Sequence, residues 1–331
     1  MTGLAALPSC WIVTDGKAGM ESQCLGLAEA LDLVPVIKRV GLRAPWRQLS
    51  PYLRHGHGHA FTAGSDPLEP PWPDLLIASG RHSIAASLYV RAQSERAGKR
   101  TITVQIQNPA IAPGFFDLVI APAHDNLKGK NVLATAGALH RITPEKLAAE
   151  AGKLAPRVSH LPRPYIGVLI GGANSAFRFG SAEVRALANG LASCARDSKG
   201  SLLVTPSRRT GETNLALLRD LLGDTPSLIW DGTGENPYLG ILGLSDQLVV
   251  TSDSVNMVSE AVATGKPVQV FDLPGGSRKF RRFHRAMREE GRTFPFAGAL
   301  VSAAMTPELG DMARAAEAVR ALLRGNGLLF S

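Results

Sequence analysis

Short apolar segments alternate with segments of helical periodicity twice along this chain of 331 residues. Such alternation is typical of parallel sheets whose strands are joined by helical crossovers. In the first half, apolar residues at helical spacing from Met20 to Leu31 predict a helix between the first two strands. The predicted strands are residues 10–14, 34–40, 75–79, 101–105 and 118–121, then 165–170, 201–205, 227–230, 247–251 and 268–271. The sequence therefore predicts an α/β protein with two sheets in tandem.

A segment rich in alanine, lysine, arginine and proline, residues 151–164, separates the two sets of strands. Domain boundaries fall in such segments, and a chain of this length favours two cores over one. We predict a Rossmann-like domain over residues 1–155 and a second over residues 164–331, facing each other across a cleft. The last helix, with apolar residues from Met312 to Leu323 along one face, could pack against either domain.

Residues 43–73 interrupt the alternation with six prolines and with His55, His57 and His59, which alternate with glycine. This composition predicts a long loop. The histidines suggest a metal ion, but no further ligand is near in the sequence, and we predict no metal site. The three cysteines are too few and too widely spaced for a disulfide framework or a zinc pattern.

The net charge of +8 favours anionic partners such as nucleotides, phospholipid surfaces or nucleic acid. No apolar run reaches the roughly 18 to 20 residues that cross a bilayer, and residues 1–13 lack the basic start of a secretion signal. We expect a soluble cytoplasmic protein, with peripheral attachment to the inner face of the membrane as an extension of that expectation.

The turn after the first strand contains Asp15, Gly16, Lys17 and Gly19, with Gln23 one turn into the following helix. Glycines let the backbone approach a ligand, and a helix amino terminus favours an anion. Neither a Walker loop nor a Gly-x-Gly-x-x-Gly fingerprint is present. The alternative is a structural turn in which Asp15 caps the helix.

The turn after the first strand of the second half contains Gly171 and Gly172, followed by Asn174. Paired glycines with small polar neighbours can wrap backbone N–H groups around phosphate oxygens. We therefore predict that this turn contacts a substrate.

Two arginines follow the next strand, in the segment Ser207, Arg208, Arg209 and Thr210. Each guanidinium group can donate two parallel hydrogen bonds to phosphate oxygens, so this segment is a candidate diphosphate clamp. An exposed turn with solvated charges is the alternative.

The richest segment contains Ser252, Asp253, Ser254, Asn256 and Glu260. Hydroxyl and amide groups at a helix amino terminus can bind phosphate. Glu260, deeper in the helix, could accept hydrogen bonds from ribose hydroxyls. A purely structural capping role for Ser252 and Asp253 is the alternative.

This segment, with the Gly-Lys-Pro that ends at Pro267, resembles the carboxyl-terminal donor motif of glycosyltransferase-B enzymes. In that group an acidic residue of the helix binds the donor ribose, and Glu260 is at the matching position. Gly171 and Gly172 are similar to the glycine pair that contacts the diphosphate. The resemblance implies the glycosyltransferase-B architecture for the whole chain.

Nearly the whole chain resembles the family named for the plant mitochondrial-fission Elm proteins. Many bacterial members of this family are labelled glycosyltransferases. The segments that look like its motifs are Asp15–Gly19 with Gln23, Gln107-Asn108-Pro109, Gly171-Gly172, Pro206–Thr210 and Ser252–Ser254. Each is short, and their shared order makes the resemblance specific.

These resemblances imply a nucleotide-diphosphate sugar as donor, bound by the second domain, and an acceptor bound by the first. The sequence has no Asp-x-Asp, so we expect no metal and no cofactor, with arginines, glycine N–H groups and helix termini stabilising the leaving diphosphate. Asp15 and Lys17 are the candidate catalytic residues, with Asp15 as the base. His124 and Asp125 are the alternative bases.

The basic segment Arg278–Arg285 predicts an amphipathic helix. Its basic face could meet anionic lipid head groups, which suits a cell-envelope or lipid-linked acceptor. A surface helix held by its phenylalanines is the alternative.

Three other classes remain open. The plant relatives suggest a non-catalytic protein that recruits a partner, and the same architecture also serves sugar-nucleotide epimerases. Nucleic-acid binding would use the charge, but no recognition motif or aromatic stacking platform is present, and we rank it last.

Overall fold

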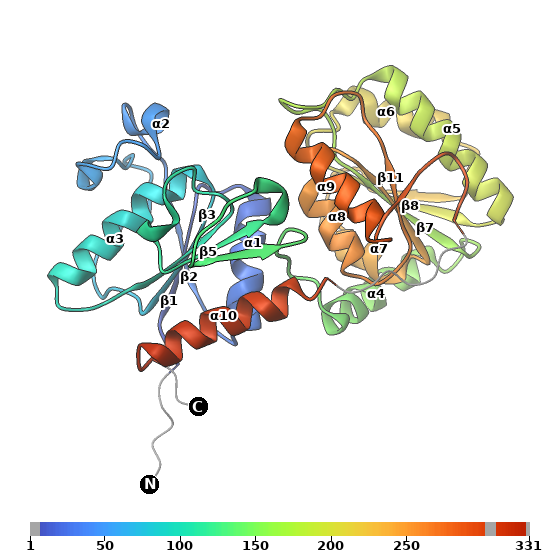
Figure 1. Ribbon diagram of the computed structural model, residues 1–331. Helices are drawn as coiled ribbons and strands as arrows, with labels where there is room; N and C mark the ends of the chain where they lie inside the picture. Colours follow the sequence, from blue (N-terminus) through green and yellow to red (C-terminus); the bar gives the residue numbers. More distant parts are fainter. Residues whose placement is uncertain (1–6, 302–308, 329–331) are drawn as a thin grey trace, which may run out of the picture. The chain divides into compact units, whose positions relative to one another are not determined.

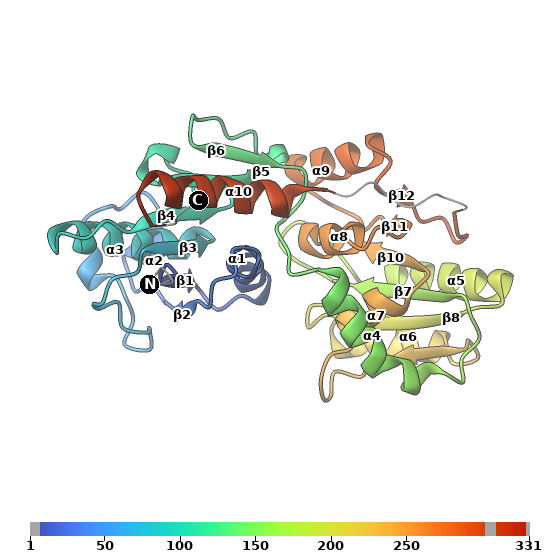
Figure 2. The ribbon, with the colours of Figure 1, turned by 90° about the horizontal axis from the view of Figure 1, so that it is seen from below.

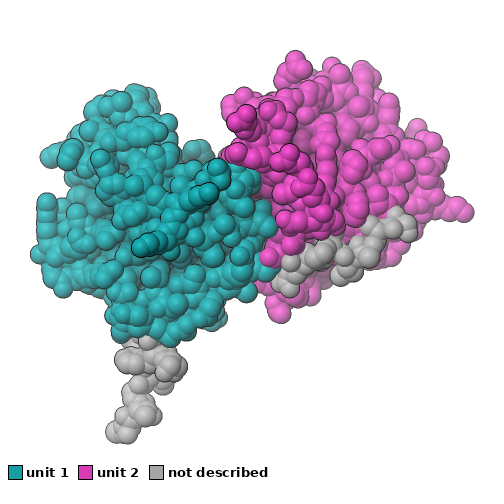
Figure 3. Space-filling model, in the orientation of Figure 1, with its two compact units in different colours: residues 1–141, 310–331 teal, residues 142–309 magenta. Residues whose placement is uncertain are grey.

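The computed structural model describes residues 7–301 and 309–328. The chain forms two compact units, residues 1–141 with 310–331 and residues 142–309, which Figure 3 colours separately. Each unit is an α/β layer structure built on one six-stranded parallel sheet (Figure 1). The α/β class with two parallel sheets, predicted from the sequence, is therefore confirmed.

The sheet of the first unit has the strand order β2-β1-β3-β4-β5-β6, and every neighbouring pair is parallel. The register places Cys10 opposite Leu75, and Leu75 opposite Ile102. The strands are β1 (Cys10–Thr14), β2 (Val36–Arg39), β3 (Leu75–Ser79), β4 (Ile102–Ile106), β5 (Leu118–Pro122) and β6 (Val132–Thr135).

Alternate strand residues of this unit face two different helix layers, as a pleated sheet requires. Ile12 and its neighbours in register pack with α1 (Ala18–Ala30) and α10 (Asp311–Gly325). Val13 and the residues beside it pack with α3 (Ile84–Arg96) on the other face. The carboxylate of Asp311 accepts a hydrogen bond from the Gly137 N–H at 2.9 Å and fixes the start of α10.

Short helical turns occupy the connections of the first unit: α2 (Trp46–Leu49), η1 (His57–His59), η2 (Arg81–Ser83), η3 (Pro113–Phe115) and η4 (Ala123–Asp125). The predicted long loop over residues 43–73 contains only α2, η1 and an isolated bridge between Leu42 and Phe61 at its edge.

The sheet of the second unit has the order β12-β11-β10-β7-β8-β9, again with every pair parallel. Its strands are β7 (Tyr165–Ile170), β8 (Ser201–Pro206), β9 (Ser227–Ile229), β10 (Gln247–Thr251), β11 (Val268–Phe271) and β12 (Phe294–Pro295). The helices of this unit are α4 (Pro144–Val158), α5 (Ser181–Ser198), α6 (Glu212–Leu221), α7 (Tyr238–Leu244), α8 (Val255–Val262) and α9 (Arg278–Glu289).

Helices cover both faces of the second sheet (Figures 1 and 2). Ile166 and Val168 of β7 pack with the apolar face of α5. Gly167, between them, points to the opposite face, where a Cβ would come within 2.3 Å of the Ser245 hydroxyl just after α7. Helix α4 packs along α7, where Gly243 permits close contact between the two helices.

The two units divide the chain differently from the predicted boundary at residues 155–164. Helix α4, which contains residues 151–158 of the segment where the boundary was predicted, belongs to the second unit because it packs on α7. The last helix, α10, belongs to the first unit because Ala316 and Val319 lie in the core with α1. Strands β6 and β12 were not predicted, and β2 is shorter than the predicted residues 34–40.

Candidate functional site

Two of the predicted substrate-binding turns lie together at the carboxyl edge of the second unit's sheet. Strands β8 and β9 lie on one side of β7 and strands β10 to β12 on the other, so the strand order reverses between β7 and β10. Ligands of open parallel sheets bind at such a reversal, outside the strand ends. Gly171 and Gly172 follow β7 at this point, and Ser252, Asp253 and Ser254 follow β10.

The buried carboxylate of Asp253 joins these turns. It accepts hydrogen bonds from the Thr251 hydroxyl at 2.6 Å, from the Gly172 N–H at 3.1 Å and from Arg209 Nη2 at 2.7 Å. The Thr251 hydroxyl oxygen accepts a further bond from the Gly171 N–H at 2.8 Å. Burial raises the pKa of Asp253, while these donors and the positive charge of Arg209 oppose the rise. Asp253 therefore holds these turns together, because its carboxylate accepts three hydrogen bonds from the protein.

The glycine pair is required by close packing within the site. A Cβ on Gly171 would lie 2.1 Å from the carboxylate of Asp253. Gly172 has a φ of +142°, and a Cβ there would lie 2.2 Å from the carbonyl oxygen of Arg209. Both glycines thus let the turn after β7 approach the Asp253 carboxylate and the arginine segment, which no larger residue would permit.

The segment from Ser207 to Thr210 is fastened to the same turn. The hydroxyls of Ser207 and Thr210 both donate to the carbonyl oxygen of Gly171, at 2.5 and 2.7 Å. Arg209 is held by its ion pair with Asp253, although its side chain is 39 % exposed. Arg208 is exposed, with no ion pair or hydrogen bond from its side chain among the described residues. The two arginines therefore differ: one belongs to the framework and the other faces solvent.

The amino terminus of α8 opens at the reversal point. Ser254 caps the helix, and its hydroxyl oxygen accepts a bond from the Met257 N–H at 3.3 Å. Asn174 crosses from the glycine turn, where its Nδ2 donates to the Asp253 carbonyl at 3.3 Å. Asn256, in the first turn of α8, is half-buried. The cap of α8 is therefore Ser254, and not Ser252 or Asp253, for which the sequence offered a capping role as the alternative.

Glu260 is partly buried on α8 and accepts a hydrogen bond from the Tyr238 hydroxyl at 2.5 Å. Burial raises the pKa of Glu260 to about 7, and the bond from Tyr238 opposes the rise. Burial also raises the pKa of Tyr238, and the nearby carboxylate adds to the effect. A carboxyl with this pKa can donate or accept a hydrogen bond near neutral pH.

The corresponding edge of the first unit contains Asp15. The strand order reverses between β1 and β3, with β2 on one side and β3 to β6 on the other. The Asp15 carboxylate accepts a hydrogen bond from Lys17 Nζ and lies 3.5 Å from Nδ1 of His82, which follows β3. Burial lowers the pKa of His82, with the charge of Lys17 as the next cause, so its neutral form is favoured at pH 7. Gly16, at φ +81°, allows the turn to fold back.

The other predicted residues of the first unit lie in different environments. Gln23 is buried in α1, and Gly19 is half-buried at its start. Gln107 has a φ of +72° beyond β4, and the side-chain oxygen of Asn108 accepts from the Ala110 N–H at 2.8 Å. The side chains of the alternative bases, His124 and Asp125, are each only 4 % exposed and lie 3.8 Å apart, so solvent hardly reaches them.

Three residues that contact predicted site residues were missed from the sequence: His82, Tyr238 and His284, whose Nε2 lies 2.7 Å from the Ser252 carbonyl oxygen. His82 lies three residues beyond the end of β3, so the rule that directed attention to Asp15 could have found it. Tyr238 and His284 reach their partners from separate helices, and nothing local to either residue signals the contact.

Within residues 7–301 and 309–328, no group of three or more histidine, cysteine, aspartate or glutamate side chains could hold a metal ion. His57 is buried, and its Nε2 lies 3.2 Å from the Leu53 carbonyl. No helix in the same described part of the chain is long and apolar enough to cross a membrane. The first six residues, part of the segment considered as a signal, lie outside the described residues.

Solved structures of low sequence identity share this fold. A UDP-GlcNAc 2-epimerase from Methanocaldococcus jannaschii, in complex with UDP-GlcNAc and UDP, is 11 % identical with a TM-score of 0.54 over 96 % of this chain and all of that one. The epimerase from Neisseria meningitidis, bound to UDP-GlcNAc, is 13 % identical with a TM-score of 0.51 over the same shares. These likenesses show the glycosyltransferase-B architecture of two Rossmann-like halves that the sequence predicts.

Sequence comparison gives a closer grouping. The mitochondrial fission protein ELM1 of Arabidopsis thaliana is 33 % identical over 285 residues, 77 % of this chain, and the match spans 65 % of the plant protein's length. An uncharacterised protein of Rickettsia prowazekii is 23 % identical over 96 % of this chain and 99 % of its own. The family described as mitochondrial fission ELM1 matches residues 18–323. This chain therefore belongs to the mitochondrial fission ELM1 family.

Proposed function

We propose that this protein is a metal-independent glycosyltransferase that binds a nucleotide-diphosphate sugar at the carboxyl edge of β7 and β10. The observation that supports this most is the set of bonds on Asp253, which holds the glycine turn, the arginine segment and the turn before α8 together. Backbone N–H groups at a helix start and a guanidinium are the groups that stabilise a leaving diphosphate. The fold, shared with enzymes that use UDP-sugars, is consistent with this proposal.

Within this proposal Arg208 binds the diphosphate from the solvent side and Glu260 accepts the ribose hydroxyls. Arg209 acts on the diphosphate through the N–H groups that its pairing with Asp253 leaves available. Gly172, in the turn after β7, and Ser254, at the start of α8, complete the diphosphate site in this proposal.

The acceptor binds, in this proposal, at the edge of the first unit's sheet, where His82 is the base that takes its hydroxyl proton. Asp15 faces Nδ1 of His82 at 3.5 Å and orients the ring, so that Nε2 is the nitrogen available to the acceptor. A carboxylate already bonded to Lys17 is a weaker base than a neutral imidazole. The acceptor is a cell-envelope or lipid-linked molecule, and the basic face of α9 favours an anionic membrane surface.

The donor site is tested by thermal shift with UDP, GDP, CDP, ADP and their common sugar conjugates, without metal. Arg208→Ala is the informative variant because its side chain is exposed, whereas Arg209→Ala would also break the pair with buried Asp253. Arg196→Ala, an exposed arginine in the last turn of α5, is the matched control. We expect one nucleotide to stabilise the protein, and Arg208→Ala alone to weaken its binding roughly tenfold.

The outcomes separate the alternatives. Stabilisation by a nucleotide sugar, with conversion of the sugar and no transfer, would identify a sugar-nucleotide epimerase. No stabilisation by any nucleotide would remove the transferase proposal and favour a protein that recruits a partner.

The base is tested by the release of nucleoside diphosphate from the donor that the screen identifies. His82→Gln should lower this rate about 100-fold or more while donor binding stays unchanged. Asp15→Asn should lower it less, because it removes only the orienting partner. His55→Gln, an exposed histidine of the same unit, is the control. Equal rates for His82→Gln and the control would exclude His82 as the base.

A further inference from the structure

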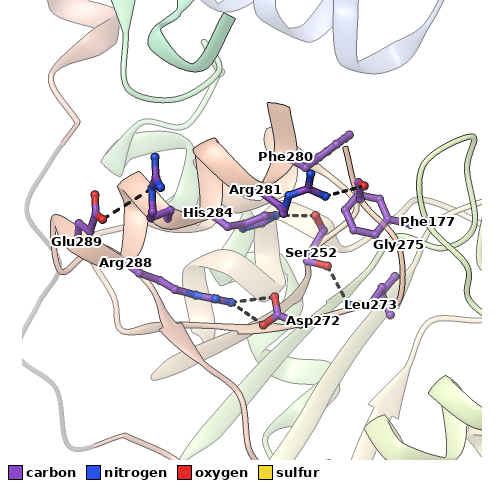
Figure 4. A pocket seen from close by; sticks show the side chains of 12 residues that line it. Phe177, Ser252, Asp272, Leu273, Gly275, Phe280, Arg281, His284, Arg288 and Glu289 are labelled. Carbon is purple, nitrogen blue, oxygen red and sulfur yellow. Dashed lines mark hydrogen bonds and ion pairs between the residues drawn. The ribbon is translucent and has the colours of Figure 1, made fainter. Parts of the chain in front are cut away.

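The second unit contains a pocket of about 470 Å³ that lies beside the turn before α8 (Figure 4). One wall is a face of α9, and the other comes from the loop after β11, from Phe177 in the loop after β7 and from Ser252 directly after β10. The volume is within the usual range for small-molecule sites, about 300 to 1,000 Å³. The residues that line it include only one of the predicted site residues, Ser252.

The pocket has an aromatic wall. Phe177 and Phe280 line it with their ring centroids 4.8 Å apart and their planes nearly perpendicular. Gly275 and Gly276, at positive φ, bring the loop after β11 against Phe177, where a Cβ on Gly276 would be 3.3 Å from that ring. An aromatic face carries a negative potential and packs well on the C–H face of a sugar ring.

His284 lines the same pocket and carries a buried nitrogen with an unused lone pair. Nε2 of His284 lies 2.7 Å from the carbonyl oxygen of Ser252. Because a carbonyl oxygen only accepts, Nε2 carries the proton and donates. Burial lowers the pKa of His284, so the ring is neutral and Nδ1 is an acceptor. Nδ1 is buried and has no hydrogen-bond partner among the described residues, while the residue is 7 % exposed. A ligand with a hydroxyl or N–H donor would complete it.

The charge of the pocket is positive. Helix α9 carries six arginine or lysine side chains and one glutamate. Arg288 is paired with Asp272 at 2.7 Å, and Arg285 lies 3.8 Å from Glu289. Arg281 has no carboxylate within 4.0 Å among the described residues, and its Nη1 donates only to the Gly276 carbonyl at 3.3 Å. The lining therefore offers one uncompensated guanidinium, which favours an anionic group.

We propose that this pocket binds a monosaccharide that carries an anionic group, with its ring on Phe280, a hydroxyl donating to Nδ1 of His284 and the anion on Arg281. This proposal deepens, and rests on, the proposed transferase function, because it makes the sugar of the donor an acidic or phosphorylated one. A carboxylate and a phosphate ester are the two forms of anion that the guanidinium accepts.

The test uses free sugars, so that it does not depend on which nucleotide binds. Dissociation constants for D-glucuronate, D-glucose 6-phosphate and D-glucose are measured by ligand-observed NMR on the full chain. We expect at least one of the two anionic sugars to bind about tenfold more tightly than glucose. Arg281→Ala should abolish this preference, and Arg278→Ala, an exposed arginine of the same helix outside the pocket, should retain it. Tighter binding of D-glucuronate would identify a carboxylate as the anionic group, and tighter binding of D-glucose 6-phosphate would identify a phosphate.

Equal affinity for the three sugars would overturn the proposal, and so would a preference that survives Arg281→Ala. Loss of the preference in Arg278→Ala as well would also count against it, because it would reflect the charge of the helix as a whole. Failure of the nucleotide screen together with retained binding of an anionic sugar would instead remove the proposed function and leave the pocket as a sugar site.

Discussion

Asp253 joins the glycine turn to the arginine segment, and its burial decides how much it contributes to stability. Replacing it by Asn leaves the Arg209 guanidinium and the Gly172 N–H facing a neutral amide. We expect Asp253→Asn to lower the free energy of unfolding by about 2 kcal/mol, less than for a fully buried pair because Arg209 is partly exposed. Urea denaturation measures this difference.

Asp272→Asn is the control for that measurement. Asp272 also pairs with an arginine, Arg288 at 2.7 Å, but its side chain is 57 % exposed. Exposed pairs contribute about 1 kcal/mol or less, so this variant should unfold close to the parent. A loss as large in Asp272→Asn as in Asp253→Asn would show that burial is not the cause.

Glu260 makes the stability of the protein depend on pH. Its pKa in the folded protein, about 7, lies above the ordinary glutamate value of 4.5, so the folded state holds a proton that the unfolded state releases. This contribution is fully present below about pH 4.5 and is lost as the pH rises through 7. Compared with Glu260→Gln, the parent should lose about 2 kcal/mol of unfolding free energy between pH 5 and pH 7.5. Parallel denaturation curves for the two proteins at both pH values would contradict this.

At the scale of elements, the contact between α4 and α7 depends on glycine. A Cβ on Gly243 would lie 2.5 Å from the Leu147 carbonyl oxygen, and a backbone atom cannot move aside cheaply. Glycine to alanine in a helix normally stabilises by about 1 kcal/mol. Gly243→Ala should instead destabilise, by roughly 2 kcal/mol, since the inserted methyl group forces the helices apart.

Gly152→Ala is the matched variant for this prediction. Gly152 lies inside α4, and a Cβ there would meet no atom within 4 Å. This change should raise the melting temperature while Gly243→Ala lowers it. Shifts of the same sign in both variants would mean that helix propensity, not packing, determines the result.

Most elements were predictable because their signals are local. Strands such as Cys10–Thr14 and Tyr165–Ile170 are apolar runs bounded by turn residues, and their bounds agree with the structure. Strand β6 (Val132–Thr135) was missed because it lies at an edge of the sheet and only its last residue is buried, so its apolar run is short. Lys266, assigned to a donor motif, donates to the carbonyls that end α7, a partner that periodicity cannot reveal.

At the scale of the whole molecule, long-range packing is what local sequence patterns could not predict. The last helix has one apolar face, and this face fits any sheet. Its position in the first unit follows from Asp311, which bonds to Gly137, and from Val319 in the core beside α1. The candidate sites follow the same rule: motifs at strand ends were found, whereas His284, which reaches Ser252 from α9, was not. His82 was also missed, although it lies just beyond the end of β3 and the same rule could have found it.

The two possible boundaries make different predictions for the isolated second half. A polypeptide of residues 142–309 keeps α4, whose Leu154 and Val158 are buried, and ends before α10. A polypeptide of residues 164–331 loses α4 and retains α10, which leaves the apolar surface of α7 and the buried side of α10, including Val319 and Leu323, without their partners.

We expect residues 142–309 to unfold cooperatively and to bind the nucleotide identified for the full chain, because every contact of Asp253 lies within this segment. Residues 164–331 should be aggregation-prone or lack a cooperative transition, since buried apolar surface contributes about 25 cal/mol per Å². Circular dichroism and thermal shift on the two polypeptides check this. The opposite result, with cooperative folding of residues 164–331 and none of residues 142–309, would support the boundary predicted from composition. It would also show that the second half folds without the contacts between α4 and α7.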